Sequence, residues 1–207
     1  MSIRKKILAI SIGPVLVLGV ITLLFMLTMV KSSLMDEGQD ALKGTAAATL
    51  AAYDQNTGDY LESTNGDIWK GSYNISKSES LVDRIKENTG MDVTFFYGNK
   101  RIMTSALDKK GNRILGSEAG ERVVNQVIKG KKPFFSTNVS LDGTRNYGYF
   151  IPVYQNGTTD QVIGMVFVGT NKARKDAIVN KILGSIMMAL LVVMLLFQVL
   201  LFLQFQV

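Results

Sequence analysis

The chain has 207 residues, a formal net charge of +6, and neither histidine nor cysteine. The missing histidine removes the commonest general base and transition-metal ligand, and the missing cysteine removes any disulfide framework. The basic residues are spread along the chain rather than clustered, which argues against a nucleic-acid surface. There is no G-x-S-x-G sequence and no pair of carboxylates on regular elements. We therefore expect a protein that is not an enzyme, with no metal or other cofactor and no nucleic-acid partner.

Two uncharged apolar segments, residues 7–30 and 182–207, bracket the rest of the chain. A hydrocarbon core about 30 Å thick needs roughly 20 apolar helical residues, so each segment is long enough to span it. We predict a transmembrane helix in each. The intervening residues 31–181 are enough for one domain of about 150 residues.

Three basic residues, Arg4, Lys5 and Lys6, directly precede the first apolar segment. By the positive-inside tendency, residues 1–6 form a cytoplasmic tail and residues 31–181 lie outside the membrane. A cleaved signal peptide is the alternative for the first segment. Its apolar stretch is longer than the usual signal core and no small-x-small site follows it, which favours an uncleaved anchor. The sequence thus predicts a two-pass protein of the cell membrane.

Helical signals continue from the first apolar segment into the outer domain. An alanine-rich stretch favours helix as far as about residues 56–58, so we expect a long stalk helix. Residues 59–77, which include the lone Trp69, lack a clear period and are expected to be a loop with a short turn of helix. Residues 80–83 have a capping-box pattern that predicts a short helix, ending at Gly90.

From residue 93 onward the apolar period changes to two, which indicates strands. Residues 93–97 and 101–105 flank the turn pair Gly98-Asn99 and predict a hairpin. A turn at Gly111-Asn112 and a short return strand at 113–115 are expected next. A helix is then expected to begin at Ser117 and to end at Gly130.

In the last part of the domain the sequence pattern predicts three more strands, at residues 134–139, 144–154 and 162–170. A final helix is predicted from Lys172. Turn pairs of the Asp-Gly and Asn-Gly type separate the strands and favour tight hairpins. Because consecutive hairpins give an antiparallel sheet that helices must cover on at least one face, the fold class is α+β with about five strands.

Four stretches of the domain together resemble a known family. They are residues 101–105 (RIMTS), 111–117 (GNRILGS), 149–154 (YFIPVY) and 162–169 (VIGMVFVG). In order and spacing they are similar to a single Cache domain, the PAS-like extracytoplasmic sensor of bacterial chemoreceptors and sensor kinases. The resemblance covers roughly residues 81–173 and is nearest to the subtype found in methyl-accepting chemotaxis proteins.

The resemblance implies that a small ligand lies between the sheet and the loops and helices covering one face. The residues expected to bind it are Arg101, Thr104, Arg113, Ser117, Tyr147 and Tyr149. Arginine offers fixed donors that suit a carboxylate, as in a small carboxylate or an amino acid, and hydroxyls orient the remainder of the ligand.

Structural roles are the alternatives for these residues. Arg113 could neutralise Glu118, Ser117 could cap a helix, and the two tyrosines could pack in the core. No basic residue directly precedes Pro152, where the citrate and dicarboxylate sensors of this fold have a basic pair. That difference argues against a tricarboxylate ligand.

The function implied by the resemblance is a transmembrane ligand-sensing input module of a chemoreceptor, acting as a homodimer and signalling through the second span. Family receptors continue into a HAMP module and a cytoplasmic signalling domain, whereas this sequence ends at Val207. The alternatives are the input module of a histidine kinase or cyclase, or a truncated membrane-tethered scaffold with no output.

Overall fold

The computed structural model describes residues 3–204 of the chain. It divides into two units, which are described separately: a helical unit from the described parts of residues 1–37 and 176–207, and a sheet unit, Gly38–Lys175. Residues 1–2 of the predicted tail and residues 205–207 of the second predicted span lie outside the described residues.

The helical unit consists of parts of two long helices, α1 (Ile3–Asp54) and α4 (Lys172–Gln204). By length and composition both are able to cross a membrane, with mean hydropathies of 2.0 and 2.6 in their apolar stretches. Within the unit they meet at Gly19, where an added Cβ would lie 2.8 Å from the Cε of Met194. The bounds confirm the predicted stalk helix, which ends close to residue 56, and the start of the final helix at Lys172.

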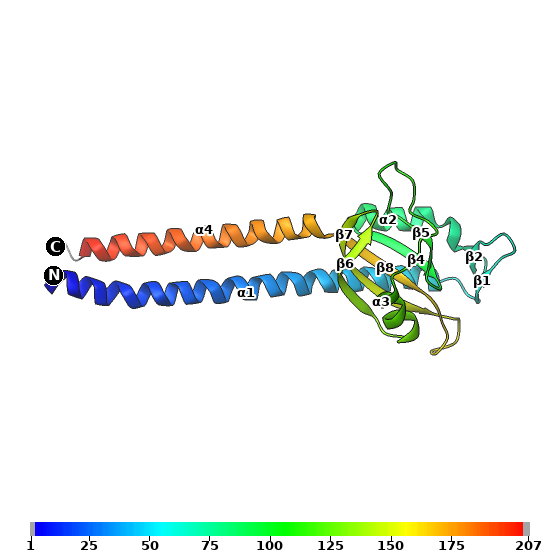
Figure 1. Ribbon diagram of the computed structural model, residues 1–207, viewed down its shortest axis with the longest axis horizontal. Helices are drawn as coiled ribbons and strands as arrows, with labels where there is room; N and C mark the ends of the chain where they lie inside the picture. The colour runs from blue at the N-terminus through cyan, green and yellow to red at the C-terminus, as the bar shows by residue number, and fades with distance from the viewer. Residues whose placement is uncertain (1–2, 205–207) are drawn as a thin grey trace. The chain divides into compact units, whose positions relative to one another are not determined.

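The sheet unit is built on a five-stranded antiparallel sheet in the order β5-β4-β8-β7-β6 (Figure 1). Its strands are β4 (Asp92–Tyr97), β5 (Lys100–Thr104), β6 (Phe134–Leu141), β7 (Thr144–Tyr154) and β8 (Val162–Asn171). The α+β class, the first hairpin and the last three strands are therefore confirmed. The longest strands, β7 and β8, lie near the centre and pair over almost their whole length.

Helices cover the two faces of the sheet differently. On one face the Phe95 ring is 5.2 Å from the ring of Tyr53 in α1 and 5.8 Å from that of Tyr60, and all three side chains are buried. The helix α2 (Glu79–Thr89) packs on β4 and β5. On the other side of the sheet, as Figure 1 shows, lies α3 (Glu121–Val123), which continues as the π-helical segment η2 (Val124–Lys129) against β7 and β8.

Residues 59–77 are not the predicted loop. They form a small antiparallel sheet of β1 (Tyr60–Glu62), β2 (Ile68–Lys70) and β3 (Tyr73–Asn74), followed by the 3-10 turn η1 (Ile75–Lys77). Lys70 is buried there, with its Nζ 3.7 Å from Asp54 and 4.3 Å from the centre of the Tyr60 ring. A buried lysine at a position facing the core hides the alternation that would have revealed these strands.

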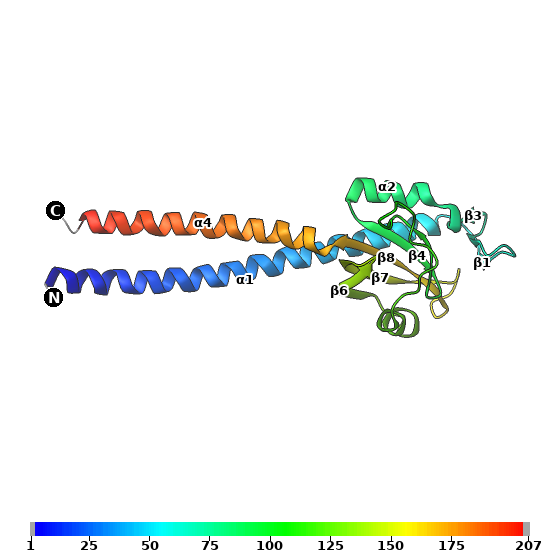
Figure 2. The ribbon, with the colours of Figure 1, turned by 45° about the horizontal axis from the view of Figure 1, so that its top comes forward.

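The small sheet, whose strands β1 and β3 are labelled in Figure 2, is joined to the end of β7 by the side chain of Gln155. Its Oε1 accepts a hydrogen bond from Tyr60 N at 2.8 Å, and its Nε2 donates one to Tyr60 O at 3.1 Å. The side-chain amide thus makes the two hydrogen bonds that a neighbouring strand would make. Both the N–H and the C=O group of Tyr60 therefore have a hydrogen-bond partner.

Two predicted helix starts were wrong. Helix α2 begins at Glu79 after Ser78, so Ser80 lies inside the first turn and cannot cap the helix. The Ser78 hydroxyl, at the cap position, donates to Ile75 O at 2.7 Å rather than accepting from the first turn. Its predicted end is confirmed by Gly90, which has a left-handed φ of 70°.

The helix expected from Ser117 begins only at Glu121. The backbone before it is already engaged with β5, since Arg101 N donates to Ser117 O and Gly116 N donates to Arg101 O, both at 2.9 Å. The predicted return strand at 113–115 is reduced to a single bridge between Leu107 and Arg113. Residues 113–120 therefore form an extended segment along the edge of the sheet rather than a regular element.

We predict that Gly164→Ala disrupts the sheet. Its Cβ would lie 2.0 Å from the carbonyl oxygen of Phe96 on the adjacent strand, so β4 and β8 would have to separate locally. The expected loss is about 2 kcal/mol or more of unfolding free energy. The full-length protein in detergent would be unfolded with denaturant and followed by the fluorescence of Trp69, its single tryptophan.

Gly44→Ala is the control, since nothing lies within 4 Å of the added Cβ and alanine favours a helix interior by up to about 1 kcal/mol. Equal midpoints for the two variants would contradict the close approach at Gly164.

Candidate functional site

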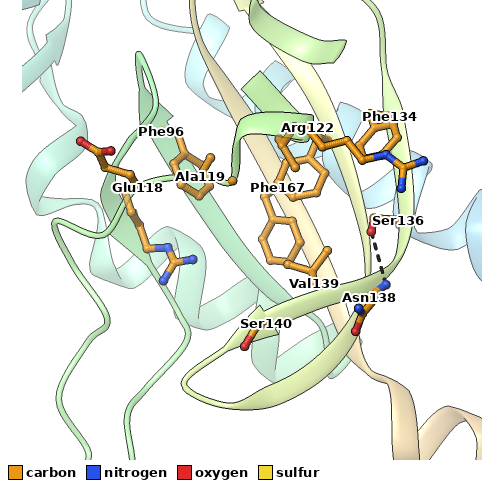
Figure 3. Close-up of a pocket in the computed structure, with 14 residues that line it drawn as sticks. Phe96, Glu118, Ala119, Arg122, Phe134, Ser136, Asn138, Val139, Ser140 and Phe167 are labelled. Atoms are coloured by element: carbon orange, nitrogen blue, oxygen red, sulfur yellow. Dashed lines mark hydrogen bonds between the residues drawn. The ribbon is translucent and has the colours of Figure 1, made fainter. Parts of the chain in front are cut away.

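A pocket of about 360 Å³ lies on the side of the sheet that α3 and η2 cover (Figure 3). This volume falls within the range of small-molecule sites. Its apolar lining consists mainly of Phe96, Val123, Phe134, Val139, Phe150 and Phe167. Its polar lining consists of Arg101, Glu118, Arg122, Ser136, Asn138 and Ser140.

The strand registers explain why the phenylalanines face the pocket. Phe134 of β6 is opposite Phe150 of β7, which is opposite Phe167 of β8. Residues directly opposite each other in an antiparallel sheet share a face, so the three rings form a row across neighbouring strands. The centres of the Phe150 and Phe167 rings are 4.8 Å apart. Phe96 of β4 adds a fourth ring, and together they give the pocket a rigid apolar floor.

Arg101 supplies a buried positive charge to this pocket. Its side chain comes from β5, where residue 101 pairs with Phe96, and its guanidinium carbon lies 5.4 Å from the centre of the Phe96 ring. The residue is only 7% exposed. One hydrogen bond is made, from Nη1 to Ile114 O at 3.3 Å, whereas Nε is buried without a hydrogen-bond partner.

No carboxylate of the described residues lies within ion-pair distance of Arg101. Burial lowers the pKa of its guanidinium, and the charge of Asp92 opposes that shift. An arginine side chain nevertheless stays protonated in proteins. The pocket therefore contains a buried cation with an unused donor, an arrangement that is unfavourable unless an anion joins it.

Two charged side chains at the rim complete the electrostatics. The guanidinium of Arg122 lies 5.3 Å from the centre of the Phe134 ring, and Glu118 is exposed. Figure 3 shows Glu118 and Arg122 on either side of the phenylalanines. Within the described part of the chain neither is in a salt bridge. Together with the buried Arg101, these side chains give the pocket an excess of positive charge above an apolar floor, which suits a small anion with an apolar body.

Of the residues predicted to bind a ligand, Arg101 is the one that lines this pocket. Thr104 is fully buried nearby, where its hydroxyl pairs with that of Thr94 at 2.7 Å and accepts a bond from Ala106 N. Ser117 is exposed, and its carbonyl, rather than its hydroxyl, receives the Arg101 N–H. Both residues thus shape the surroundings of Arg101.

Tyr147 and Tyr149 point to the other face of the sheet. They alternate with Phe150 along β7, and Tyr149 is opposite Phe135 rather than a pocket residue. The Tyr147 ring stacks on that of Phe135 with centres 6.3 Å apart, and its hydroxyl accepts a hydrogen bond from Lys172 Nζ. The sequence placed both tyrosines on one face, and the register decides that this is not the face of the pocket.

Arg113 fastens the segment that borders the pocket. Its Nη1 donates to Asp83 Oδ1 at 2.9 Å and to Thr104 O at 2.7 Å, while Nη2 also bonds the carboxylate. The hydrogen bonds from Arg113 lower the pKa of Asp83, and those to Asp83 raise the pKa of Arg113. The expectation that Arg113 neutralises Glu118 was wrong, because its partner is on α2. This clamp holds residues 113–120 in place.

The sequence reasoning missed most of the pocket lining. Its floor consists of phenylalanines that look like ordinary core residues, and Arg122 and Glu118 look like solvated charges. A register for β6, β7 and β8 would have shown Phe134, Phe150 and Phe167 in one row. Among the described residues no group of His, Cys, Asp or Glu is placed to hold a metal ion.

Comparisons with known proteins bear on the fold. Residues 73–182 match the protein family described as "Single cache domain 3". A search of curated proteins finds no significant match. Among solved structures, an extracellular ligand binding receptor from Desulfohalobium retbaense superposes with a TM-score of 0.51 at 15% identity, over 74% of this chain and 26% of that one. The chain therefore spans about a quarter of that receptor.

Two other solved structures superpose less closely. The ligand-binding domain of the Campylobacter jejuni chemoreceptor Tlp3, in complex with L-valine, has a TM-score of 0.48 at 12% identity, over 74% of this chain and 60% of that one. The E. coli DcuS sensor domain has a TM-score of 0.41 at 13% identity, over 73% and 98%. Such identities reflect fold alone.

We predict that the Asp83–Arg113 clamp makes stability depend on pH. Because the pKa of Asp83 is lowered in the folded protein, its contribution is present above about pH 4 and is lost as the pH falls through the folded-state value. Asp83→Asn should lower the free energy of unfolding by about 1 kcal/mol at neutral pH, since the pair is partly exposed. The deficit should shrink as the pH falls below about 4.

Denaturant unfolding of the full-length protein across this pH range would measure the deficit. Asp160→Asn is a matched control, because Asp160 is exposed and has no salt bridge in the described part of the chain. A deficit that stays constant with pH would contradict the role of the ionised pair.

Proposed function

Because the chain belongs to the single Cache domain 3 family, which matches it over residues 73–182, we propose that it is a membrane-anchored sensor of a small anionic metabolite. The observation that carries this proposal is Arg101, a buried arginine that lines the pocket, has no carboxylate partner among the described residues and has an Nε–H without a hydrogen-bond partner. The family supports a sensory ligand-binding domain, and the buried arginine favours a ligand with a negative charge.

Arg101 binds the anionic group of the ligand in this proposal. A carboxylate against the guanidinium would supply the missing counter-ion for a buried side chain that makes one side-chain hydrogen bond within the described residues, from Nη1 to Ile114 O. The phenylalanine floor receives the apolar body of the ligand. Glu118 at the rim would accept an ammonium group, so small carboxylates and amino acids both fit the charges present.

The two apolar helices anchor the sensor in the cell membrane. We place the spans at residues 7–30 and 182–207, with the basic tail of residues 1–6 in the cytoplasm and residues 31–181 outside. Both α1 and α4 have the length and apolar composition for this. The chain then acts as a homodimeric input module of a chemoreceptor, as its family resemblance implies.

Strand β8 connects the pocket to the second span. It contributes Phe167 to the pocket and ends at Asn171, and α4 begins at the next residue, Lys172. A ligand that favours one position of β8 therefore also favours one position of the start of α4. The output can change only by as much as the ligand distinguishes the two states.

The test is ligand-induced stabilisation of the full-length protein in detergent, screened against carboxylates and amino acids. A ligand at about 100 times its dissociation constant should add roughly 2.7 kcal/mol of stability. Arg101→Met should abolish the shift. Arg84→Met removes the same charge from an exposed position of α2 outside the pocket and should leave the shift unchanged. A hit that survives Arg101→Met would place the ligand elsewhere.

A second prediction needs no ligand. Arg101→Met removes a buried cation that has no counter-ion in the part of the chain that the structure describes, and methionine can cover the Phe96 ring. The unliganded variant should therefore be more stable than the wild type, by roughly 1–3 kcal/mol. Denaturant unfolding without ligand measures this difference. A clearly less stable variant would mean that Arg101 is a structural residue satisfied by the protein itself.

A further inference from the structure

We propose that Phe167 sets the size limit of the pocket. Its ring rests on a pair of glycines and fills the space that larger side chains at those two positions would occupy. This inference rests on the proposed function for its ligand, but the geometry is a property of the pocket itself. Phe167 is buried with only 1% of its surface exposed, and it forms part of the pocket wall.

The glycines are Gly148 of β7 and Gly169 of β8, which are directly opposite each other in the sheet. An added Cβ at Gly148 would lie 2.5 Å from Cε2 of Phe167, and one at Gly169 would lie 2.3 Å from Cζ. The ring therefore covers the part of the sheet where two neighbouring strands have no side chain. Neither glycine has a positive φ, so the backbone does not require glycine at these positions.

The same ring is held from its other sides. Phe150 lies 4.8 Å away between ring centres, and Val139, which Figure 3 shows beside Phe167, has a methyl group 2.8 Å from the position of a Cβ at Gly148. A ring packed in this way cannot move deeper toward the sheet, and a ligand cannot pass beneath it. The apolar depth of the pocket thus ends at Phe167.

The arrangement predicts opposite effects for two kinds of substitution. Phe167→Leu shortens the side chain over the glycine pair and opens space continuous with the pocket. Gly148→Ala fills the position beneath the ring and forces Phe167 outward into the pocket. Phe95→Leu is the matched control, since Phe95 is equally buried but packs against Tyr53 and Tyr60 on the other face.

The first measurement is the affinity of the full-length protein in detergent for unbranched carboxylates from acetate to octanoate. Each methylene that can be buried should raise affinity about fourfold until the chain meets Phe167. In Phe167→Leu the rise should continue to longer chains than in the wild type, and in Gly148→Ala it should stop at shorter ones. Phe95→Leu should share the wild-type limit.

The second measurement uses no ligand and exploits the absence of cysteine from the chain. Ser136→Cys places a thiol in the pocket opposite Gly148. Its reaction with methyl, butyl and benzyl methanethiosulfonates reports the space available. The bulky reagents should react faster in the Phe167→Leu background and slower in the Gly148→Ala background, with Phe95→Leu matching the wild type.

The two measurements separate the two proposals. If the labelling rates follow this order but no carboxylate binds, the anion-sensing proposal fails and the size limit at Phe167 stands. If carboxylates bind with the same length limit in every variant, or if the labelling rates do not differ, Phe167 does not set the size of the pocket and this inference is overturned.

Discussion

The pairing of β7 with β8 is the constraint on which the rest of the sheet unit depends. It is the most extensive pairing in the sheet, running from Asn146 opposite Asn171 to Tyr154 opposite Val162. Because successive side chains of a strand alternate between faces, this one register decides two surfaces at once. Phe150 and Phe167 face the pocket, whereas Tyr147 and Tyr149 lie on the other face of the sheet. A slip of one residue would exchange them and remove the pocket.

The pocket face has two features that cost the fold stability. A core of this kind would be more favourable with an apolar residue in place of Arg101, since a buried guanidinium without a counter-ion carries a desolvation penalty. The fold tolerates the charge because the Phe96 ring and the Ile114 carbonyl partly compensate it. Gly148 and Gly169 likewise contribute no side-chain packing from their own strands, and the space they leave is occupied by the Phe167 ring. Both features are easier to understand as parts of a binding site than as parts of a core.

An irregular segment borders this site and is nonetheless fixed in place. Residues 113–120 have no helix or strand of their own, but backbone hydrogen bonds tie them to β5 and Arg113 ties them to Asp83 of α2. The same segment supplies Glu118 to the rim. Since its order depends on contacts distant in sequence, local propensity could not reveal it, and the expected helix start at Ser117 was displaced to Glu121.

The sequence by itself determined the elements with strong periodicity: the two apolar helices, the first hairpin, the three long strands and their antiparallel class. Each follows from side-chain spacing and turn residues close in the chain. It also singled out Arg101. Only the tertiary structure decided which residues surround that arginine, because a pocket floor is made by register between strands. It likewise decided that Lys70 is buried in a small sheet and that Arg113 pairs with Asp83, since both depend on partners that folding alone brings together.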